Sequence, residues 1–300
     1  MPETDLLLDE STRRKLEQIS LVATRVRAGA MKGERRSNKR GTSIEFADYR
    51  NYAPGDDLRR LDWNIYARLE RPYIKLLEDE EDLAVHLLLD TSASMDWPQE
   101  GERELNKLLF AKRLFASLAY VSLHTNDRLL MTALTDKGLD HFGPTRGRAQ
   151  SVAMLRFVHA LKPAGSTDLN VMLRDYALRG GMPGLCFIIS DMFSPSGYLE
   201  GINQLLGKGY EVALLHLLSP DEITPPLTGD LRLIDVETGT PQEVSVDPGL
   251  RELYIKRVEA WRDSIRAECV RRGIHYFALD TTMLWEKVIL FEMRRAGLVK

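Results

Sequence analysis

The chain has 300 residues, and its 41 Lys and Arg residues nearly balance its 44 Asp and Glu residues, which gives a formal net charge of -3. Hydrophobic residues make up 44% of the chain, so a substantial core can form and global disorder is excluded. The best apolar run, residues 83–89, is interrupted by His86 and has the length of a strand, so we expect no membrane span. The acidic start lacks the basic and apolar regions of a signal peptide, which predicts a cytoplasmic chain.

Residues 1–80 are predicted to form an N-terminal segment distinct from the domain that follows. Apolar residues at helical spacing predict a helix over residues 11–28. Basic residues from Arg25 to Arg40, interrupted by glycines, predict an exposed arm. A Pro54-Gly55 turn followed by two aspartates predicts a short helix that ends near Leu61.

Residues 81–300 are predicted to form a second domain, in which strands alternate with helices. Predicted strands cover residues 83–89, 128–134, 185–189, 211–217 and 274–279. Ser194-Pro195 predicts the start of a helix that ends near Gly207. A hairpin over residues 231–246 and a long helix up to Gly273 follow. Such alternation predicts an α/β fold with a mostly parallel sheet and helices on both faces.

Two of the predicted buried strands lead into an aspartate, Asp90 and Asp191. Hydroxyl residues follow Asp90 in the segment Thr91–Ser94, and another loop contributes Ser166 and Thr167. In open α/β sheets, ligands bind beyond the carboxyl ends of the strands, where the strand order reverses. We therefore expect two carboxylates and several hydroxyls to converge there, as oxygen ligands suited to Mg²⁺ or Mn²⁺.

A purely structural role for these residues stays open, because Ser and Asp after a strand often only cap the next helix. For Asp168, capping of the following helix is the role that we favour over metal ligation.

Three short motifs, DTSAS at residues 90–94, GST at 165–167 and SD at 190–191, resemble the D-x-S-x-S…T…D metal-ion-dependent adhesion site of von Willebrand factor A domains. This resemblance implies a von Willebrand A-like, Rossmann-like fold with an N-terminal extension and a small hairpin insertion. It also implies a weakly bound Mg²⁺ or Mn²⁺. The residues that it assigns to the metal site are Asp90, Ser92, Ser94, Thr167 and Asp191. In such sites the hydroxyls touch the metal and the carboxylates act largely through water, which leaves a position open for a partner's carboxylate.

The stretch before the first motif, RRSNKRGTSIEFADYRNYAPGDDLRRLDWNIYARLERPYIK, is similar to the bacterial family known as domain of unknown function 58. The resemblance covers nearly the whole chain. Genes of that family often accompany MoxR-type AAA ATPases. The resemblance therefore implies a metal-dependent protein–protein interaction module that works with such an ATPase or its client, in protein assembly or chaperone-like activation.

Two other functions stay open. Asp90 could be the nucleophile of a metal-dependent, phosphatase-like hydrolase, although Ser92 stands where haloacid-dehalogenase-type enzymes have a second Asp. No phosphate-binding loop, dinucleotide fingerprint or nucleophile elbow occurs in the sequence, so we expect no enzymatic activity. The basic arm from Arg25 to Arg40 could bind nucleic acid, but the near-neutral overall charge favours a solvated arm.

Overall fold

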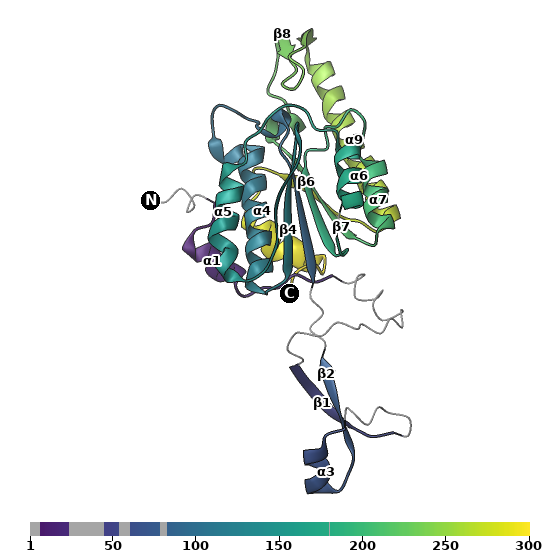
Figure 1. The fold of residues 1–300 in the computed structure, drawn as a ribbon. Helices are drawn as coiled ribbons and strands as arrows, with labels where there is room; N and C mark the ends of the chain where they lie inside the picture. The colour runs from purple at the N-terminus through teal and green to yellow at the C-terminus, as the bar shows by residue number, and fades with distance from the viewer. Residues whose placement is uncertain (1–6, 24–44, 54–60, 79–82, 180) are drawn as a thin grey trace. The chain divides into compact units, whose positions relative to one another are not determined.

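The structure is a computed structural model, and its contacts divide the chain into two compact units (Figure 1). The larger unit comprises Met1–Lys32 and Leu83–Lys300, and the smaller one comprises Gly33–Asp82. This division differs from the predicted one, which assigned all of residues 1–80 to the N-terminal segment. The residues that the structure describes are 7–23, 45–53, 61–78, 83–179 and 181–300.

A six-stranded sheet forms the centre of the larger unit. Its strands are β3 (Ala84–Asp90), β4 (Arg128–Thr135), β5 (Gly138–Thr145), β6 (Leu185–Ser190), β7 (Glu211–Leu218) and β10 (His275–Asp280). The strand order is β10-β7-β6-β3-β4-β5, and every neighbouring pair is parallel except β4 and β5. The predicted mostly parallel sheet is therefore confirmed.

Helices cover both faces of this sheet (Figure 1). One face packs with α4 (Lys107–His124) and α5 (Ser151–Ala160), and the other with α6 (Leu169–Arg179), α7 (Leu199–Gly207) and α9 (Pro248–Arg272). Successive side chains of a strand point to opposite faces, so Leu87 and Leu89 of β3 belong to one core cluster and Leu88 to the other. Burial on both faces explains why β3 reads as an apolar run that only His86 interrupts before Asp90.

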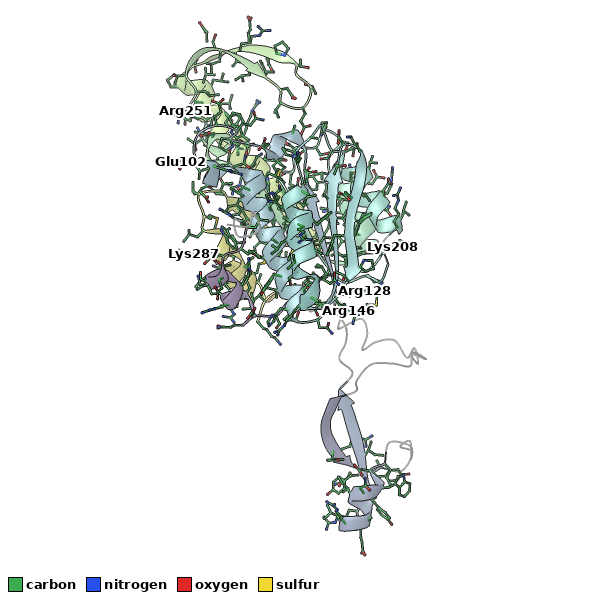
Figure 2. The ribbon with its side chains drawn as sticks, turned by 60° about the vertical axis from the view of Figure 1, so that its left-hand side comes forward. Glu102, Arg128, Arg146, Lys208, Arg251 and Lys287 are labelled. Carbon is green, nitrogen blue, oxygen red and sulfur yellow. The ribbon has the colours of Figure 1, made fainter. Side chains whose placement is uncertain are left out.

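Many charged side chains on the helices and loops point outward from the larger unit, and Glu102, Lys208 and Lys287 are examples (Figure 2). Within the parts of the chain that the structure describes, no helix is long and apolar enough to cross a membrane.

The first helix is shorter than predicted. Helix α1 covers Glu10–Leu16 and is capped by Asp9, whose carboxylate accepts a hydrogen bond from the Thr12 amide at 2.8 Å. The chain then leaves the helix because it pairs with the C-terminus: Leu21 and Val299 form an antiparallel bridge, and the Val22 amide donates to the Leu298 carbonyl. The predicted helix is therefore wrong for residues 17–23, and its last residues, 24–28, lie outside the described residues. The basic arm and most of the helix predicted near Leu61 also lie outside them.

A hairpin and the N-terminal half of a long helix lie beyond the carboxyl ends of the strands. Strands β8 (Gly229–Ile234) and β9 (Pro241–Val246) pair antiparallel, as predicted. Asp247 caps α9, whose C-terminal half buries Ile265 and Cys269. The N-terminal half of α9 extends past the sheet beside this hairpin, which leaves its apolar side chains partly exposed (Figure 1).

A helix predicted to begin at Ser194-Pro195 begins later, at Leu199. The Ser194 hydroxyl instead accepts a hydrogen bond from the Leu169 amide at 3.2 Å, at the start of α6. The serine therefore caps a helix that is distant in sequence rather than the one that follows it.

The smaller unit consists of a two-stranded antiparallel sheet and a helix. Its elements are β1 (Glu45–Asn51), α3 (Trp63–Leu69) and β2 (Tyr73–Glu78). The Asp62 carboxylate caps α3 by accepting from the amides of Asn64 and Ile65, and it also accepts from the Tyr49 hydroxyl at 2.9 Å. This aspartate therefore joins the helix to the sheet.

Truncation of Leu298 should destabilise the larger unit. Leu298 is fully buried beside the pairing of the two chain ends, so Leu298→Ala should lower the free energy of unfolding by about 2–5 kcal/mol in urea denaturation. The matched control is Leu178→Ala, because Leu178 is 65% exposed. Equal losses in the two variants would show that the C-terminal pairing contributes nothing particular to stability.

The side chain of His86 is buried, and each of its two ring nitrogens has a hydrogen-bond partner. Its Nε2 lies 3.1 Å from the Met182 carbonyl, which can only accept, so Nδ1 accepts from the Tyr176 hydroxyl at 2.6 Å. Burial lowers the pKa of His86 to about 4, from an ordinary value of 6.5.

This lowered pKa predicts acid lability. As the pH falls below 6.5, the unfolded chain binds a proton at His86 before the folded chain does, so the folded state loses stability until the pH passes about 4. Relative to His86→Gln, the unsubstituted protein should lose about 2–3 kcal/mol between pH 7 and pH 4 in denaturant unfolding. His159→Gln, at an exposed position on α5, is the control. Parallel pH profiles of the His86 variant and the unsubstituted protein would contradict the prediction.

Candidate functional site

The two aspartates singled out in the sequence lie at the carboxyl ends of neighbouring central strands. Asp90 is the last residue of β3, and Asp191 directly follows β6. Strands β4 and β5 lie on one side of β3, whereas β6, β7 and β10 lie on the other, so the strand order reverses between β3 and β6. This reversal is where ligands bind in open α/β sheets.

Asp90 is a buried carboxylate that is held only by neutral donors. Its Oδ1 accepts from the Thr167 hydroxyl at 2.9 Å and from the Ser92 amide at 3.0 Å, and its Oδ2 accepts from the Ser190 hydroxyl at 2.7 Å. No cationic side chain among the described residues forms an ion pair with it. Burial and the neighbouring charge of Asp191 raise the pKa of Asp90 to about 6. A cation placed here would therefore compensate a charge that the protein leaves unpaired.

The hydroxyl groups of the site lie on two loops that are joined by hydrogen bonds. The side-chain oxygens of Ser92 and Ser94 are 3.0 Å apart. The Ala93 amide donates to the Gly165 carbonyl at 2.8 Å, which holds the loop after β3 against the loop that carries Thr167. The structure thus brings Asp90, Ser92, Ser94 and Thr167 into one network.

Asp191 lies beside this network, but its carboxylate is paired with a lysine. Its Oδ2 is 2.7 Å from Nζ of Lys107, and its Oδ1 accepts from the Phe193 amide. The same Nζ lies 2.6 Å from Oε1 of Glu222. Burial alone would lower the pKa of Lys107, but the charges of Asp191 and Glu222 outweigh it and raise this pKa. Lys107 is therefore a buried ammonium shared by two carboxylates.

The sequence interpretation missed Lys107, Ser190 and Glu222. Lys107 is the first residue of α4 and is fully buried, and a buried lysine needs anionic partners. The partners of Lys107 could not be identified from the sequence, because Asp191 and Glu222 lie 84 and 115 residues away in the chain.

Asp168 takes the capping role favoured for it. Its Oδ1 accepts from the Val171 amide at 3.0 Å, in the first turn of α6, and from the Ser196 hydroxyl at 2.6 Å. Its carboxylate therefore already has two donors of its own, and the structure gives no reason to add it to the metal site.

The donor set of the site fits a hard divalent cation. The hydroxyls of Ser92, Ser94 and Thr167 stand next to the unpaired Asp90 carboxylate, and oxygen donors are what Mg²⁺ and Mn²⁺ prefer. The described residues contain no group of three or more His, Cys, Asp or Glu side chains that could hold a metal. A metal at this site would therefore depend on the hydroxyls.

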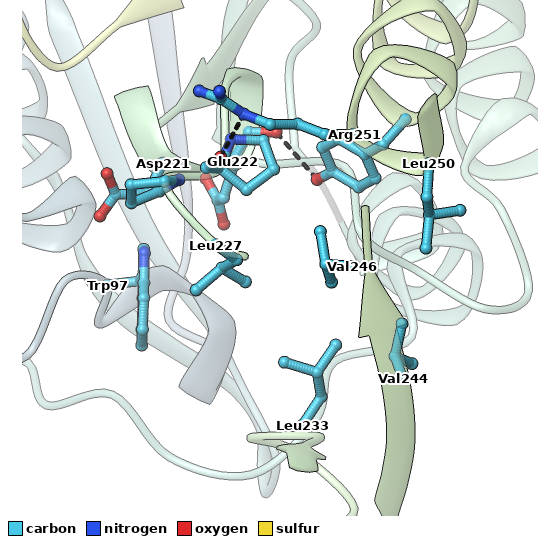
Figure 3. Close-up of a pocket in the computed structure, with 12 residues that line it drawn as sticks. Trp97, Asp221, Glu222, Leu227, Leu233, Val244, Val246, Leu250 and Arg251 are labelled. Atoms are coloured by element: carbon cyan, nitrogen blue, oxygen red, sulfur yellow. Dashed lines mark hydrogen bonds between the residues drawn. The ribbon is translucent and has the colours of Figure 1, made fainter. Parts of the chain in front are cut away.

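An apolar pocket of about 470 Å³ opens near the site (Figure 3). Its walls come from α8 (Pro220–Ile223), the β8–β9 hairpin, α9 and Trp97. Two hydrogen bonds brace it, from Arg251 to the Pro225 carbonyl and from the Tyr254 hydroxyl to the Glu222 carbonyl, both at 2.8 Å. A second hollow shares Trp97 and Glu222 with it and is also lined by Ser94, so the pocket and the candidate metal site are neighbours.

Comparison with known proteins identifies the family. Residues 48–264 match the family described as "Protein of unknown function DUF58", and the chain belongs to it. The uncharacterized protein Mb1516 of Mycobacterium bovis is 26% identical over 280 residues, which are 92% of this chain and 87% of that protein. The uncharacterized protein Rv1480 of Mycobacterium tuberculosis is equally similar over the same shares of the two chains.

Two solved structures show weaker similarity. The conserved hypothetical protein BatB from Bacteroides thetaiotaomicron has a TM-score of 0.43 at 16% identity, over 72% of this chain and 98% of that chain. The pilus adhesin SpaC from Lactobacillus rhamnosus GG has a TM-score of 0.36 at 13% identity, over 57% of this chain and 28% of that chain. TM-scores this low carry no argument about the fold.

Titration with Mg²⁺ or Mn²⁺ in a calorimeter should show one weak site that Asp90→Ala abolishes, because that variant removes the unpaired carboxylate. The control is Asp168→Asn, which keeps a side-chain oxygen for capping α6 and should leave metal binding unchanged. Undiminished binding in Asp90→Ala, or loss of binding in Asp168→Asn alone, would contradict the assignment of the site.

Proposed function

We propose that this DUF58 protein is a metal-dependent protein-interaction module with a von Willebrand A-like fold. In this proposal Ser92, Ser94 and Thr167 hold Mg²⁺ or Mn²⁺ directly, and Asp90 and Asp191 act on the metal largely through water. The observation that carries the proposal is the Asp90 carboxylate, which is buried at the switch point of the sheet beside three hydroxyls and has only neutral donors.

Two features support the von Willebrand A-like fold. The sheet is parallel except for β5 at its edge, and helices cover both faces. The D-x-S-x-S, Thr and Asp positions of the adhesion motif fall on the ends of β3 and β6 and on the loop that packs against Ala93. The motif and the topology are independent of each other, and both favour this fold.

The chemistry of the site suits binding rather than turnover. A divalent cation held mainly by neutral oxygens would keep positive charge and could accept a carboxylate from another protein. Ser92 and Ser94 are positioned by the loop after β3, and Thr167 is oriented by its hydrogen bond to Asp90. Asp90 has donors on both of its oxygens and is only 2% exposed, which weighs against its acting as a hydrolase nucleophile.

The surface beside the site favours a protein partner. Trp97 and Phe193 are more than 40% exposed, and the apolar pocket extends from Trp97 to the hairpin. An acidic residue at the metal with apolar contacts around it matches the usual anatomy of a protein interface. The partner that we propose is a MoxR-type AAA ATPase or its client, in protein assembly or chaperone-like activation in the cytoplasm.

Binding between the purified protein and a candidate MoxR-type ATPase should need both the metal and the serine hydroxyls. Because a charge-assisted contact would be lost, we expect EDTA and Ser92→Ala each to weaken the complex about tenfold or more in a quantitative pull-down. Ser264→Ala, at an exposed position on α9, is the control, and circular dichroism should show the same fold in all variants. A complex that is indifferent to EDTA and to Ser92→Ala would contradict the proposal.

A further inference from the structure

We infer that Lys107 withholds Asp191 from the metal, so that the metal binds weakly alone and tightly only together with a carboxylate from outside the chain. This inference rests on the metal site proposed above and concerns its regulation. Lys107 is a positioning residue in this scheme, because it acts on the metal through Asp191.

The geometry shows that both oxygens of Asp191 are engaged. Oδ2 is 2.7 Å from Nζ of Lys107, and Oδ1 accepts from the Phe193 amide at 3.0 Å. Lys107 and Asp191 are completely buried, so water does not screen their attraction. A metal that drew Asp191 into direct contact would have to break a buried ion pair, which is costly.

Glu222 holds Lys107 from the other side. Its Oε1 lies 2.6 Å from Nζ, and its Oε2 accepts from the Ser219 amide at 2.8 Å in the capping box of α8. The capping box fixes the position of this carboxylate, and the carboxylate fixes the lysine beside Asp191. Lys107 therefore cannot turn away from the metal site without giving up a second, partly buried partner.

The charges around the site determine how tightly a metal binds alone. The single ammonium of Lys107 is shared by Asp191 and Glu222, so Asp90 is the one carboxylate of the site that forms no ion pair among the described residues. An ammonium beside the site also repels a divalent cation. Because both oxygens of Asp191 are engaged, a partner's carboxylate supplies a charged ligand that the site itself does not offer, so metal and carboxylate should bind cooperatively.

The test measures Mn²⁺ binding by calorimetry or electron paramagnetic resonance, with and without acetate as the carboxylate probe. Lys107→Met alone would leave Asp191 and Glu222 buried without a cation and would destabilise the fold. The double variant K107M/E222Q leaves only Asp191 without a cation, and Asp191 is the carboxylate that the metal is then expected to bind. Glu222→Gln alone is its matched control. We expect Mn²⁺ to bind K107M/E222Q about tenfold or more tightly than it binds Glu222→Gln. Acetate should tighten Mn²⁺ binding in the unsubstituted protein and in Glu222→Gln, but not in K107M/E222Q.

Adding Asp90→Ala to each protein separates failure of this inference from failure of the metal site. If Glu222→Gln and K107M/E222Q bind Mn²⁺ equally, and Asp90→Ala abolishes both, the metal site stands and the inference about Lys107 is wrong. If the double variant alone binds no Mn²⁺, the inference about Lys107 is likewise wrong. If Asp90→Ala changes nothing, the metal site itself is wrong and the inference falls with it.

Discussion

The carboxylate of Asp90 is the constraint on which the candidate site depends. Its three hydrogen bonds join the loop after β3, the loop that carries Thr167 and the last residue of β6. The carboxylate is buried, so each donor compensates part of the cost of removing its charge from water. The same bonds hold the hydroxyl groups near the switch point of the sheet, where a metal would use them.

Lys107 extends this arrangement from the sheet to the surface. It begins α4, pairs with the aspartate after β6, and contacts the glutamate of α8. Glu222 also lines the apolar pocket beside the β8–β9 hairpin (Figure 3). A movement of the Lys107 ammonium toward either carboxylate would therefore affect both the metal site and the pocket.

The hairpin and the N-terminal half of α9 have a different role from the sheet. They lie beyond the carboxyl ends of the strands (Figure 1). Much of their apolar surface remains exposed, including the side chains of Leu233 and Tyr254. The sheet supplies the rigid base that a metal site needs, and these elements place apolar surface next to it. A partner that reaches the metal would meet this surface as well.

The sequence by itself determined the parallel sheet, the hairpin, the long helix and the positions of Asp90 and Asp191, because period, turn residues and caps are local signals. The tertiary structure alone decided three other features. Helix α1 ends at Leu16 because the chain after it pairs with residues at the C-terminus. Ser194 caps α6 rather than α7 because packing brings it to the Leu169 amide. Asp191 is paired with Lys107 because α4 begins beside the end of β6, and no local pattern relates residues that far apart in the chain.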